Sequence, residues 1–542
     1  MPTNRLEAAT AAAWRLHDPA LPAALDPAVL AKRLRAGSIP RALRRRALAG
    51  GPQGTIGIDD EQVSLRTLHR QVESVAGRLA GIGAGPERPA VLAAAPSLDF
   101  VRCYLALLAL RCPVVLANPA ATGAELAAQI TRAGVSVALT AGQASDTVAD
   151  LARLGTPELA APQASAKRPA APLAHVPIEA LDSLPAASRG VPLSQLPRSS
   201  AVAIYALTSG TTGVPKLAPL RHGDMEASIR AVMAAWRWRR SDTVVHALPL
   251  YHQHGLGALH AAILSGSSLH CGSRFDPERL VAEAKRRAAS VLFAVPAMWE
   301  RLTDAHSTVE APSLRLLISG SAPLPAALFE RINDVFGQPP LERYGTTESG
   351  LNLSNLYDGP RQPGGVGFPL PGVEIKIDSQ TGELSVRGPQ VFGGYAGGDT
   401  LDADDWFATG DLAELDPESG AVTITGRCKD IIITGGINVL PREVEDVLGR
   451  HPAVGAAAVV GVPSARWGEE VTAFVVSAGA FDEEELRGWC RRELSGYKVP
   501  KRIHAVAEIP RNSMGKTMRD RLVAWGLAAA AAEKPQGGPG SD

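Results

Sequence analysis

The chain has 542 residues, 45% of them hydrophobic and 20% charged, which is typical of a globular protein with large cores. Lysine plus arginine and aspartate plus glutamate both number 55, so no net charge favours nucleic acid or an acidic surface. Its longest apolar run is too short to span a bilayer, it lacks a signal-peptide pattern, and its five cysteines are scattered, so we expect a reduced, cytoplasmic, soluble protein.

The first part of the chain combines helical signals with a parallel α/β pattern. Residues 1–50 are alanine-rich, and their basic run from Lys32 to Arg46 fits a solvated helical face better than a membrane-surface helix. From 57 to 140, apolar β-like runs alternate with helical stretches, as in 89–94 followed by 99–109. This alternation predicts a parallel sheet covered by helices.

Later segments divide the rest of the chain. Residues 156–200 are rich in proline and alanine, which predicts an exposed insertion or linker. Residues 201–345 return to α/β alternation, and 364–411 become β-rich, with a predicted hairpin over 374–387. We therefore expect an α/β fold with three parts: a large N-terminal domain (1–427) of α/β subdomains plus a β-rich subdomain, a small mobile α+β C-terminal domain (428–527), and a disordered tail (528–542).

A glycine- and hydroxyl-rich loop follows the β-prone run 203–207. Its glycines bring backbone N–H groups close to an anion, its hydroxyls donate to phosphate oxygens, and its final lysine adds a positive charge. Pro215 stands where a Walker loop needs glycine, and a polar surface turn is the alternative. The loop predicts a phosphate site made by Thr208, Ser209, Gly210, Thr211, Thr212, Gly213 and Lys216.

Three further stretches carry candidate chemistry. Glu348 ends Tyr344-Gly345-Thr346-Thr347-Glu348, and a carboxylate beside hydroxyls suits Mg²⁺ bound to nucleotide phosphates. Asp411 follows Gly410 and could accept from ribose hydroxyls, although a turn-capping role is the commoner fate of this pair. Lys516 follows Asn512-Ser513-Met514-Gly515; an ammonium here would stabilise a transition state that spreads negative charge, while a surface lysine is the alternative.

From about Val63 to Arg519, these motifs occur in the order found in the adenylate-forming superfamily, and the chain resembles its acyl-CoA synthetases, luciferases and peptide-synthetase adenylation domains. The resemblance implies that Glu348 and Thr208 bind Mg²⁺, that Asp411 and Arg427 bind the ribose, and that Lys516 is catalytic, with Thr208, His252 and Glu348. It also implies a domain hinge at Lys429. The remaining ATP-site residues it implies are Ser319, Gly320, Tyr344, Gly345, Thr346 and Thr347.

The acceptor is indicated by a second glycine loop. The stretch 434–445 resembles the form found in CoA ligases, which implies that Gly435 and Gly436 line the path of the CoA pantetheine arm. Some enzymes that load carrier proteins share this loop, so a phosphopantetheinyl carrier is an alternative acceptor. An oxygen-consuming enzyme of luciferase type and a non-catalytic nucleotide-binding relative are further alternatives.

The acyl site is indicated by 248–256, which contains His252 and His254. This stretch narrows the resemblance to malonyl-, methylmalonyl- and oxalyl-CoA synthetases, which implies substrate binding by His252, His254, Gly320 and Arg301. Arg301 would bind the distal carboxylate of a dicarboxylic acid, or else lie on an exposed helical face. Thr346 departs from the methionine common in malonyl enzymes, which leaves the acid open.

The expected reaction is ATP-dependent activation of a short-chain or dicarboxylic acid to an acyl-adenylate, followed by transfer to CoA, with release of pyrophosphate and AMP. A medium- or long-chain fatty acid–CoA ligase is an alternative. ATP, Mg²⁺ and CoA are the expected cofactors, and no nucleic-acid partner is expected. Monomer and homodimer both remain open.

Overall fold

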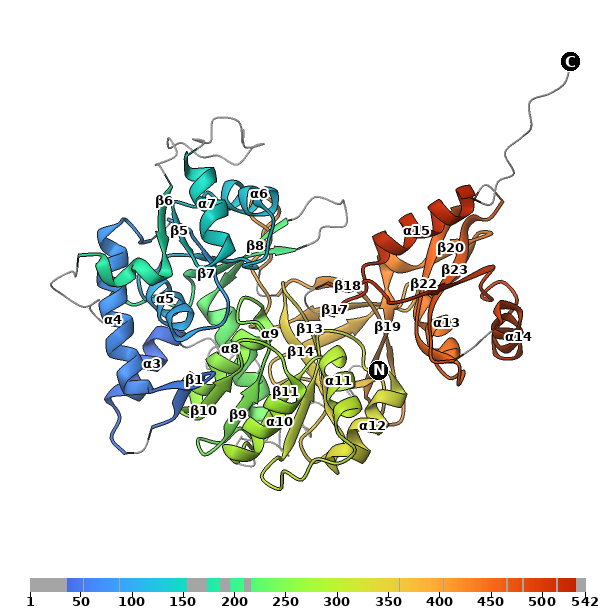
Figure 1. Ribbon diagram of the computed structural model, residues 1–542, viewed down its shortest axis with the longest axis horizontal. Helices are drawn as coiled ribbons and strands as arrows, with labels where there is room; N and C mark the ends of the chain where they lie inside the picture. The colour runs from blue at the N-terminus through green and yellow to red at the C-terminus, as the bar shows by residue number, and fades with distance from the viewer. Residues whose placement is uncertain are drawn as a thin grey trace, which may run out of the picture.

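The computed structural model describes residues 37–51, 53–86, 88–153, 173–185, 195–208, 216–359, 361–402, 404–464, 466–479, 482–512 and 515–532. The chain folds into a large mixed α/β domain and a small C-terminal domain, drawn in orange and red beside it (Figure 1). The expected fold class is therefore confirmed.

The first sheet of the large domain has six strands in the order β6-β5-β3-β4-β7-β8. Its strands run parallel except for the antiparallel pair β7–β8, which confirms the predicted parallel pattern. The strands are β3 (Ala90–Ala93), β4 (Val114–Leu116), β5 (Val137–Thr140), β6 (Ala174–Pro177), β7 (Val202–Thr208) and β8 (Lys216–Arg221). The helix α4 (Leu65–Gly81) precedes them, and the helices between them are α5 (Leu98–Ala109), α6 (Gly123–Ala133), α7 (Gln143–Arg153) and the 3₁₀ helix η1 (Ile178–Ser183).

The second sheet has 13 strands in the order β16-β17-β18-β19-β15-β14-β13-β12-β11-β9-β10-β1-β2. Its parallel part comprises β1 (Thr55–Ile58), β9 (Thr243–His246), β10 (Ser268–Cys271), β11 (Val291–Ala294), β12 (Leu316–Ser319) and β13 (Leu341–Thr346), with β2 (Glu61–Ser64) antiparallel at one edge. The β-rich part comprises β14 (Gly350–Ser354), β15 (Gly365–Pro369), β16 (Glu374–Ile377), β17 (Glu383–Arg387), β18 (Phe407–Leu415) and β19 (Val422–Arg427). Antiparallel pairing of β16 with β17 confirms the predicted hairpin.

Helices cover both faces of the parallel part of this sheet, because its strands alternate side chains between two cores. Val244 of β9 belongs to the core shared with α4 and α5, whereas the next residue, Val245, belongs to a second core. The helices packed on the first face are α3 (Ile39–Leu48), α8 (His222–Ala235) and α9 (Gln253–Ser265); those on the second are α10 (Pro277–Arg286), α11 (Pro296–Ala305) and α12 (Ala326–Phe336).

The small domain is built on a five-stranded sheet with helices on both faces. Val459 faces the core under α13 and α14, and the adjacent Val460 faces the core under α15. Its elements are η3 (Cys428–Asp430), β20 (Ile432–Thr434), β21 (Ile437–Val439), α13 (Pro441–Leu448), β22 (Val454–Ser464), β23 (Gly468–Ser477), α14 (Glu483–Glu493), β24 (Arg502–Val506) and α15 (Arg519–Ala532).

Two segments differ from the sequence-based expectation. Within 156–200, residues Ala174–Pro177 form β6, which pairs in parallel with β5, so this part is integral to the sheet rather than an insertion. The helix α15 continues through residues 528–532, which were expected to belong to the tail; 533–542 lie outside the described residues.

The basic segment near the N-terminus packs on the large domain. The apolar side chains Ile39 and Leu43 of α3 are buried in the main core, and Arg46 donates through Nε to the Leu264 carbonyl at 3.1 Å. Of the arginines of α3, only Arg45 is exposed, and Arg41 and Arg46 donate to backbone carbonyls of the large domain, so the described part of the segment is packed rather than fully solvated. None of the described helices has the length and apolar character that a bilayer-spanning helix requires.

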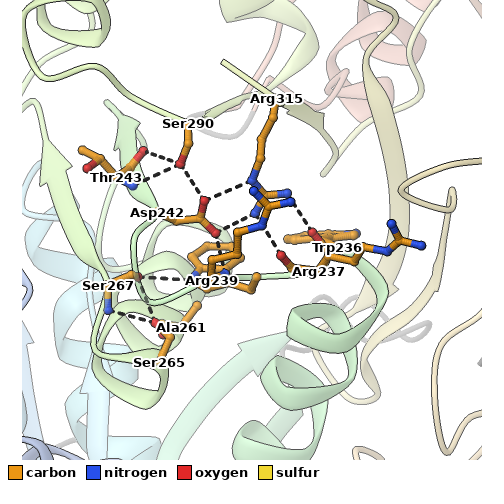
Figure 2. Close-up of polar contacts among 11 residues, drawn as sticks. Trp236, Arg237, Arg239, Asp242, Thr243, Ala261, Ser265, Ser267, Ser290 and Arg315 are labelled. Carbon is orange, nitrogen blue, oxygen red and sulfur yellow. Dashed lines mark hydrogen bonds and ion pairs between the residues drawn. The ribbon is translucent and has the colours of Figure 1, made fainter. Parts of the chain in front are cut away.

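A buried ion pair ties together the amino-terminal ends of β9, β11 and β12 (Figure 2). Arg315 Nη2 lies 2.6 Å from Asp242 Oδ2, and its Nη1 donates to the Trp236 carbonyl at 3.0 Å. The Ser290 hydroxyl donates to Asp242 Oδ1 at 2.8 Å. This network stabilises the amino-terminal end of the sheet. Ligands bind at the other end of open α/β sheets, where the carboxyl ends of the strands lie.

Candidate active site

The β7–β8 hairpin presents the predicted phosphate loop. Thr208 ends β7 and pairs in register with Lys216, which begins β8. The Thr208 hydroxyl is buried and makes no hydrogen bond of normal geometry with the described residues. Between them, the loop residues Ser209, Gly210, Thr211, Thr212 and Gly213 lie outside the described part of the chain.

An aromatic side chain links this hairpin to the candidate metal ligand. Lys216 Nζ lies 4.9 Å from the centre of the Tyr395 ring, and the Tyr395 hydroxyl donates to Glu348 Oε1 at 2.8 Å. Glu348 sits in the tight turn between β13 and β14, which the hydroxyls of Thr346 and Ser349, 2.8 Å apart, hold together. The carbonyl of Thr347 accepts from the Gln253 side chain at 3.2 Å, which joins the turn to α9.

The candidate ribose site is a preorganised cluster around Asp411. The side chain of Asp411 is buried, accepts from the Tyr344 hydroxyl at 2.6 Å and lies 2.7 Å from Arg427 Nε. Asp411 and Arg427 come from adjacent antiparallel strands in direct register, β18 and β19, while Tyr344 comes from β13. The structure thus brings together three residues that the sequence separates widely.

Lys516 of the small domain lies within electrostatic range of charged groups of the large domain. Its side chain remains accessible, yet burial and the nearby Arg427 lower its pKa, while the carboxylates of Asp411 and Glu348 act in the opposite direction. Its loop approaches the start of α11, since a Cβ added to Gly515 would lie 3.5 Å from that of Ala297. The charges of Arg427, Asp411 and Glu348 therefore act on Lys516 across the domain boundary.

Two histidines belong to the same region, since the charge of Lys516 acts on His252 and His252 in turn acts on His254. His252 is half-buried at the start of α9, and burial, followed by the nearby Lys516, lowers its pKa to about 4, so it is neutral at pH 7. His254 is buried, and its Nδ1 lies 3.0 Å from the Ser321 hydroxyl. Its Nε2 has no partner among the described groups.

Glycine at position 320 permits a close approach of β13. A Cβ at Gly320 would lie 2.6 Å from Arg343 Nε, so only glycine fits here without displacing that side chain. The preceding Ser319 has a buried hydroxyl without a partner in the described structure. Gly345 is similarly constrained, since its Cβ would lie 2.1 Å from the Gly350 carbonyl oxygen.

Arg301 stacks on Phe275 and not on the candidate site residues described above. It is exposed on α11, and its guanidinium stacks over Phe275 with a separation of 4.7 Å. This geometry favours the exposed helical face that the sequence left open as an alternative.

The predicted hinge and the CoA loop lie in the small domain's first elements. Lys429 is in the 3₁₀ helix η3, between the last strand of the large domain and β20. Gly435 and Gly436 form the β20–β21 turn with φ of 59° and 79°, a conformation that favours glycine. A Cβ on Gly436 would meet open space.

Sequence reasoning missed Tyr395 and Arg343. Tyr395 carries no motif signal, because its role depends on contacts with Lys216 and Glu348 from distant segments. Arg343 could have been found, since it immediately precedes the Tyr344–Glu348 motif and the structure places it on the strand β13. A charged residue on such a strand calls for a partner.

The donor set fits Mg²⁺ bound together with a nucleotide. The described residues hold no group of three or more histidine, cysteine, aspartate or glutamate side chains that could bind a metal alone. Mg²⁺ in nucleotide sites needs only one or two protein oxygen ligands beside phosphates and water. Glu348 and the buried Thr208 hydroxyl, which neighbours the Tyr395 hydroxyl, meet that requirement.

Comparisons with known proteins agree with this geometry. The family model for AMP-binding enzymes matches residues 43–396, and that for the AMP-binding enzyme C-terminal domain matches 443–516. The mitochondrial malonate–CoA ligase of Xenopus laevis is 34% identical over 60% of this chain and 64% of its own length, so the match spans less than two thirds of that relative. The oxalate–CoA ligase of Arabidopsis thaliana is 30% identical over 84% of this chain and 92% of its own. The ATP-bound MatB structure from Rhodopseudomonas palustris has a TM-score of 0.80 and 31% identity, covering 90% of this chain and 99% of that one.

Proposed function

The chain belongs to the family of AMP-binding enzymes, and from this premise we propose that it activates a carboxylic acid with ATP and transfers the acyl group to CoA. The observation that carries the proposal is the clustering of Tyr344 with Asp411 and Arg427, whose charges, with that of Glu348, act on Lys516 of the small domain. The names of the similar proteins, malonate–CoA ligase and oxalate–CoA ligase, support the same reaction.

In the proposed complex, the hairpin residues Thr208 and Lys216 and the loop 209–213 hold the triphosphate. Asp411 and Arg427 bind the ribose, for which the buried carboxylate offers fixed acceptor oxygens. The remaining nucleotide contacts come from Ser319, Gly320, Tyr344, Gly345, Thr346 and Thr347, which lie at the carboxyl ends of β12 and β13.

Glu348 and Thr208 would hold Mg²⁺ against the phosphates. When bound, the ion neutralises charge on the phosphates of the leaving group. The Tyr395 hydroxyl donates a hydrogen bond to one carboxylate oxygen of Glu348 and thereby orients the carboxylate.

In the first step, a carboxylate oxygen of the acid attacks the α-phosphorus, and the bond from that phosphorus to pyrophosphate breaks. Lys516 stabilises the negative charge that spreads over the reacting oxygens. His252 is neutral at pH 7, so it can hydrogen-bond the acid without adding a charge. The product is an acyl-adenylate.

In the second step, the CoA thiolate attacks the activated carbonyl and AMP leaves. We propose that the small domain rotates about Lys429 between the steps and brings Gly435 and Gly436 to line the path of the pantetheine arm. Glycine suits this position because it allows backbone to approach the thiol arm closely.

We propose a short-chain or dicarboxylic acid as the substrate. His254 and Ser319 carry buried polar atoms without described partners, and burying an apolar fatty-acid tail against them would be unfavourable, which supports this choice.

A panel of carboxylic acids, assayed for AMP release with ATP, Mg²⁺ and CoA, tests the proposal. We expect release that depends on both the acid and CoA. Release that requires a phosphopantetheinyl carrier protein and ignores CoA would favour the carrier-loading alternative, and consumption of oxygen would favour a luciferase-type reaction.

The cellular compartment and the oligomeric state of the enzyme are also proposals. All five cysteines are free thiols, which is consistent with a reducing compartment such as the cytoplasm. Whether the enzyme acts as a monomer or a homodimer is a matter for size measurement in solution.

A further inference from the structure

A polar cavity of about 280 Å³ lies at the amino-terminal end of the 13-stranded sheet, where β1, β9 and β10 begin. Its size is that of the smallest ligand sites, which measure on the order of 300 Å³. The polar residues that line it are three that begin strands, two arginines and one histidine: Thr55, Thr243, Ser268, Arg286, Arg287 and His270. None of them belongs to the candidate active site.

The three residues that begin strands all carry hydroxyls and lie side by side across the sheet. Ser268 of β10 pairs in register with Thr243 of β9. The Ser268 hydroxyl accepts from the Thr55 amide of β1 at 3.1 Å, and this leaves its own hydrogen to donate. Thr243 faces the same side of the sheet as Val245, which belongs to the core beneath α10. The row of hydroxyls therefore lies on the α10 side of the sheet.

Two arginines at the carboxyl-terminal end of α10 give this cavity a positive charge. Arg286 Nη2 and Arg287 Nε lie 2.6 and 2.9 Å from the same oxygen, Glu283 Oε2. Burial would raise the pKa of Glu283, but hydrogen bonds from the two arginines hold it below its usual value, so the carboxylate is ionised. One carboxylate compensates only one of two guanidinium charges. Arg287 also donates through Nη1 to Gln62 at 3.0 Å, which leaves its Nη2 hydrogens for a ligand.

His270 adds a buried polar atom without a partner. Its side chain is 3% exposed, and its Nε2 lies 3.3 Å from Glu283 Oε2. Its Nδ1 has no hydrogen-bond partner within the described part of the chain and occupies the space that a side chain at Gly57 would fill, 2.5 Å from the Cβ position. Buried polar atoms are seldom left unpaired, so a water molecule or a ligand is expected at this place.

We propose that this cavity binds a small phosphoryl anion at a site separate from the ATP site. Guanidinium groups bind phosphate oxygens through paired, charge-assisted hydrogen bonds, and the hydroxyls of Thr243 and Ser268 can donate to the remaining oxygens. A phosphoryl group offers three strong acceptor oxygens, which suits donors that stand on both the helix and the sheet side. The ATP-site candidates Ser319 and Thr346 lie at the opposite, carboxyl ends of their strands, so both sites can be occupied together.

The test is a calorimetric titration of inorganic phosphate into the full chain, with the ATP site saturated by a non-hydrolysable ATP analogue and Mg²⁺. We expect one further phosphate to bind per chain. Arg286→Met and Arg287→Met should each weaken this binding about tenfold, because each removes a charge-assisted hydrogen bond. Thr243→Val keeps a β-branched side chain at the start of β9 and should weaken it about threefold through loss of the hydroxyl.

Arg279→Met is the matched control. It removes an arginine from the first turn of the same helix, where Arg279 pairs with Asp59 at 3.4 Å, and phosphate should bind this variant as tightly as the wild-type enzyme. Thermal unfolding without phosphate shows whether each variant is folded. The Arg286 side chain is 57% exposed, so Arg286→Met keeps the test valid even if the loss of the more buried Arg287 prevents folding.

The same titration with AMP identifies the source of the phosphoryl group. Tighter binding of AMP than of phosphate would support the site and assign it to a nucleotide, and the reverse order would support the site and assign it to a free inorganic anion. If neither anion bound to the analogue-saturated enzyme, the proposal would be overturned. Binding that remained as tight in Arg286→Met and Arg287→Met as in the wild-type enzyme would overturn it as well.

Discussion

Glu342 and Arg343 are adjacent on β13 and are both buried, but their side chains meet different surroundings. Glu342 Oε1 accepts a hydrogen bond from the Gly364 amide at 3.2 Å, and burial raises its pKa to about 7. Burial lowers the pKa of Arg343 to about 10 and leaves it charged. Because the two side chains point to opposite faces of the strand, neither charge is available to neutralise the other.

Glu342→Gln should change how stability depends on pH. The folded-state pKa of Glu342, about 7, lies above the ordinary value of 4.5, so its contribution to stability is fully present below pH 4.5 and is lost as the pH rises through about 7. Arg442 of the small domain opposes the shift without abolishing it. Between pH 5 and 8, the free energy of unfolding of the glutamine variant should gain about 1–3 kcal/mol relative to wild type.

Urea unfolding at both pH values measures this difference. Glu330→Gln, an exposed change on α12, is the matched control. It should change the free energy of unfolding by the same amount at the lower and the higher pH. Parallel pH profiles for Glu342→Gln and wild type would mean that the buried carboxyl titrates normally.

At the residue scale, sequence indicated the residues that belong to local motifs and missed those defined by distant contacts. Glu348, Asp411 and Lys516 could be named because short motifs occur in a known order. The role of Tyr395 depends on Lys216, some 180 positions earlier, and on Glu348. No spacing rule connects such segments before the chain has folded.

At the scale of elements, apolar runs in the sequence predicted the positions of strands well. The strand β3 and the β16–β17 hairpin lie where the sequence predicted them, and β9, β11 and β12 fall within the segment 201–345 that was expected to be α/β. The strand β6 was missed because Ala-His-Val-Pro lacks both a long apolar run and alternation, and its pairing with β5 overrides its weak propensity. The end of α15 was missed because alanine-rich sequence without periodicity resembles a frayed tail.

The Asp242–Arg315 pair at the amino ends of the strands should be a major contributor to the stability of the large domain (Figure 2). Arg315→Met leaves the buried carboxylate of Asp242 without its cation and frees the carbonyls of Trp236 and Arg237. We expect a loss of about 3–5 kcal/mol in the free energy of unfolding. Adding Asp242→Asn should recover part of it, because the uncompensated charge is removed.

Denaturant unfolding of the single and double variants measures this coupling. Arg331→Met, which breaks an exposed pair with Asp304, should cost no more than about 1 kcal/mol. A cost of similar size in Arg315→Met would show that the buried pair contributes no more than a surface one.

At the scale of the whole molecule, Lys516 of the small domain lies within range of the charges of Arg427, Asp411 and Glu348, while the β20–β21 hairpin remains exposed. Ile433 and Ile437, which flank the glycine turn, are 53% and 46% exposed, which is unusual for isoleucine. This arrangement suits the first half-reaction. An enzyme that also makes the thioester would have to turn this hairpin toward Glu348, Asp411 and Arg427. The two half-reactions should then depend on different residues of the small domain.

Lys516→Ala and Gly436→Ala should separate the half-reactions. Lys516→Ala removes the charge at the reacting phosphate and should lower acid-dependent exchange of pyrophosphate into ATP by about 100-fold or more, while thioester formation from preformed acyl-adenylate persists. Gly436→Ala should preserve exchange, because its methyl group meets open space in this arrangement, and should lower thioester formation about tenfold through strain at φ 79° and crowding of the thiol arm. Gly337→Ala, at an equally positive φ beyond α12, is the control for strain alone. If Lys516→Ala or Gly436→Ala lowered both half-reactions equally, the small domain would not use different residues for the two half-reactions, and the prediction would be wrong.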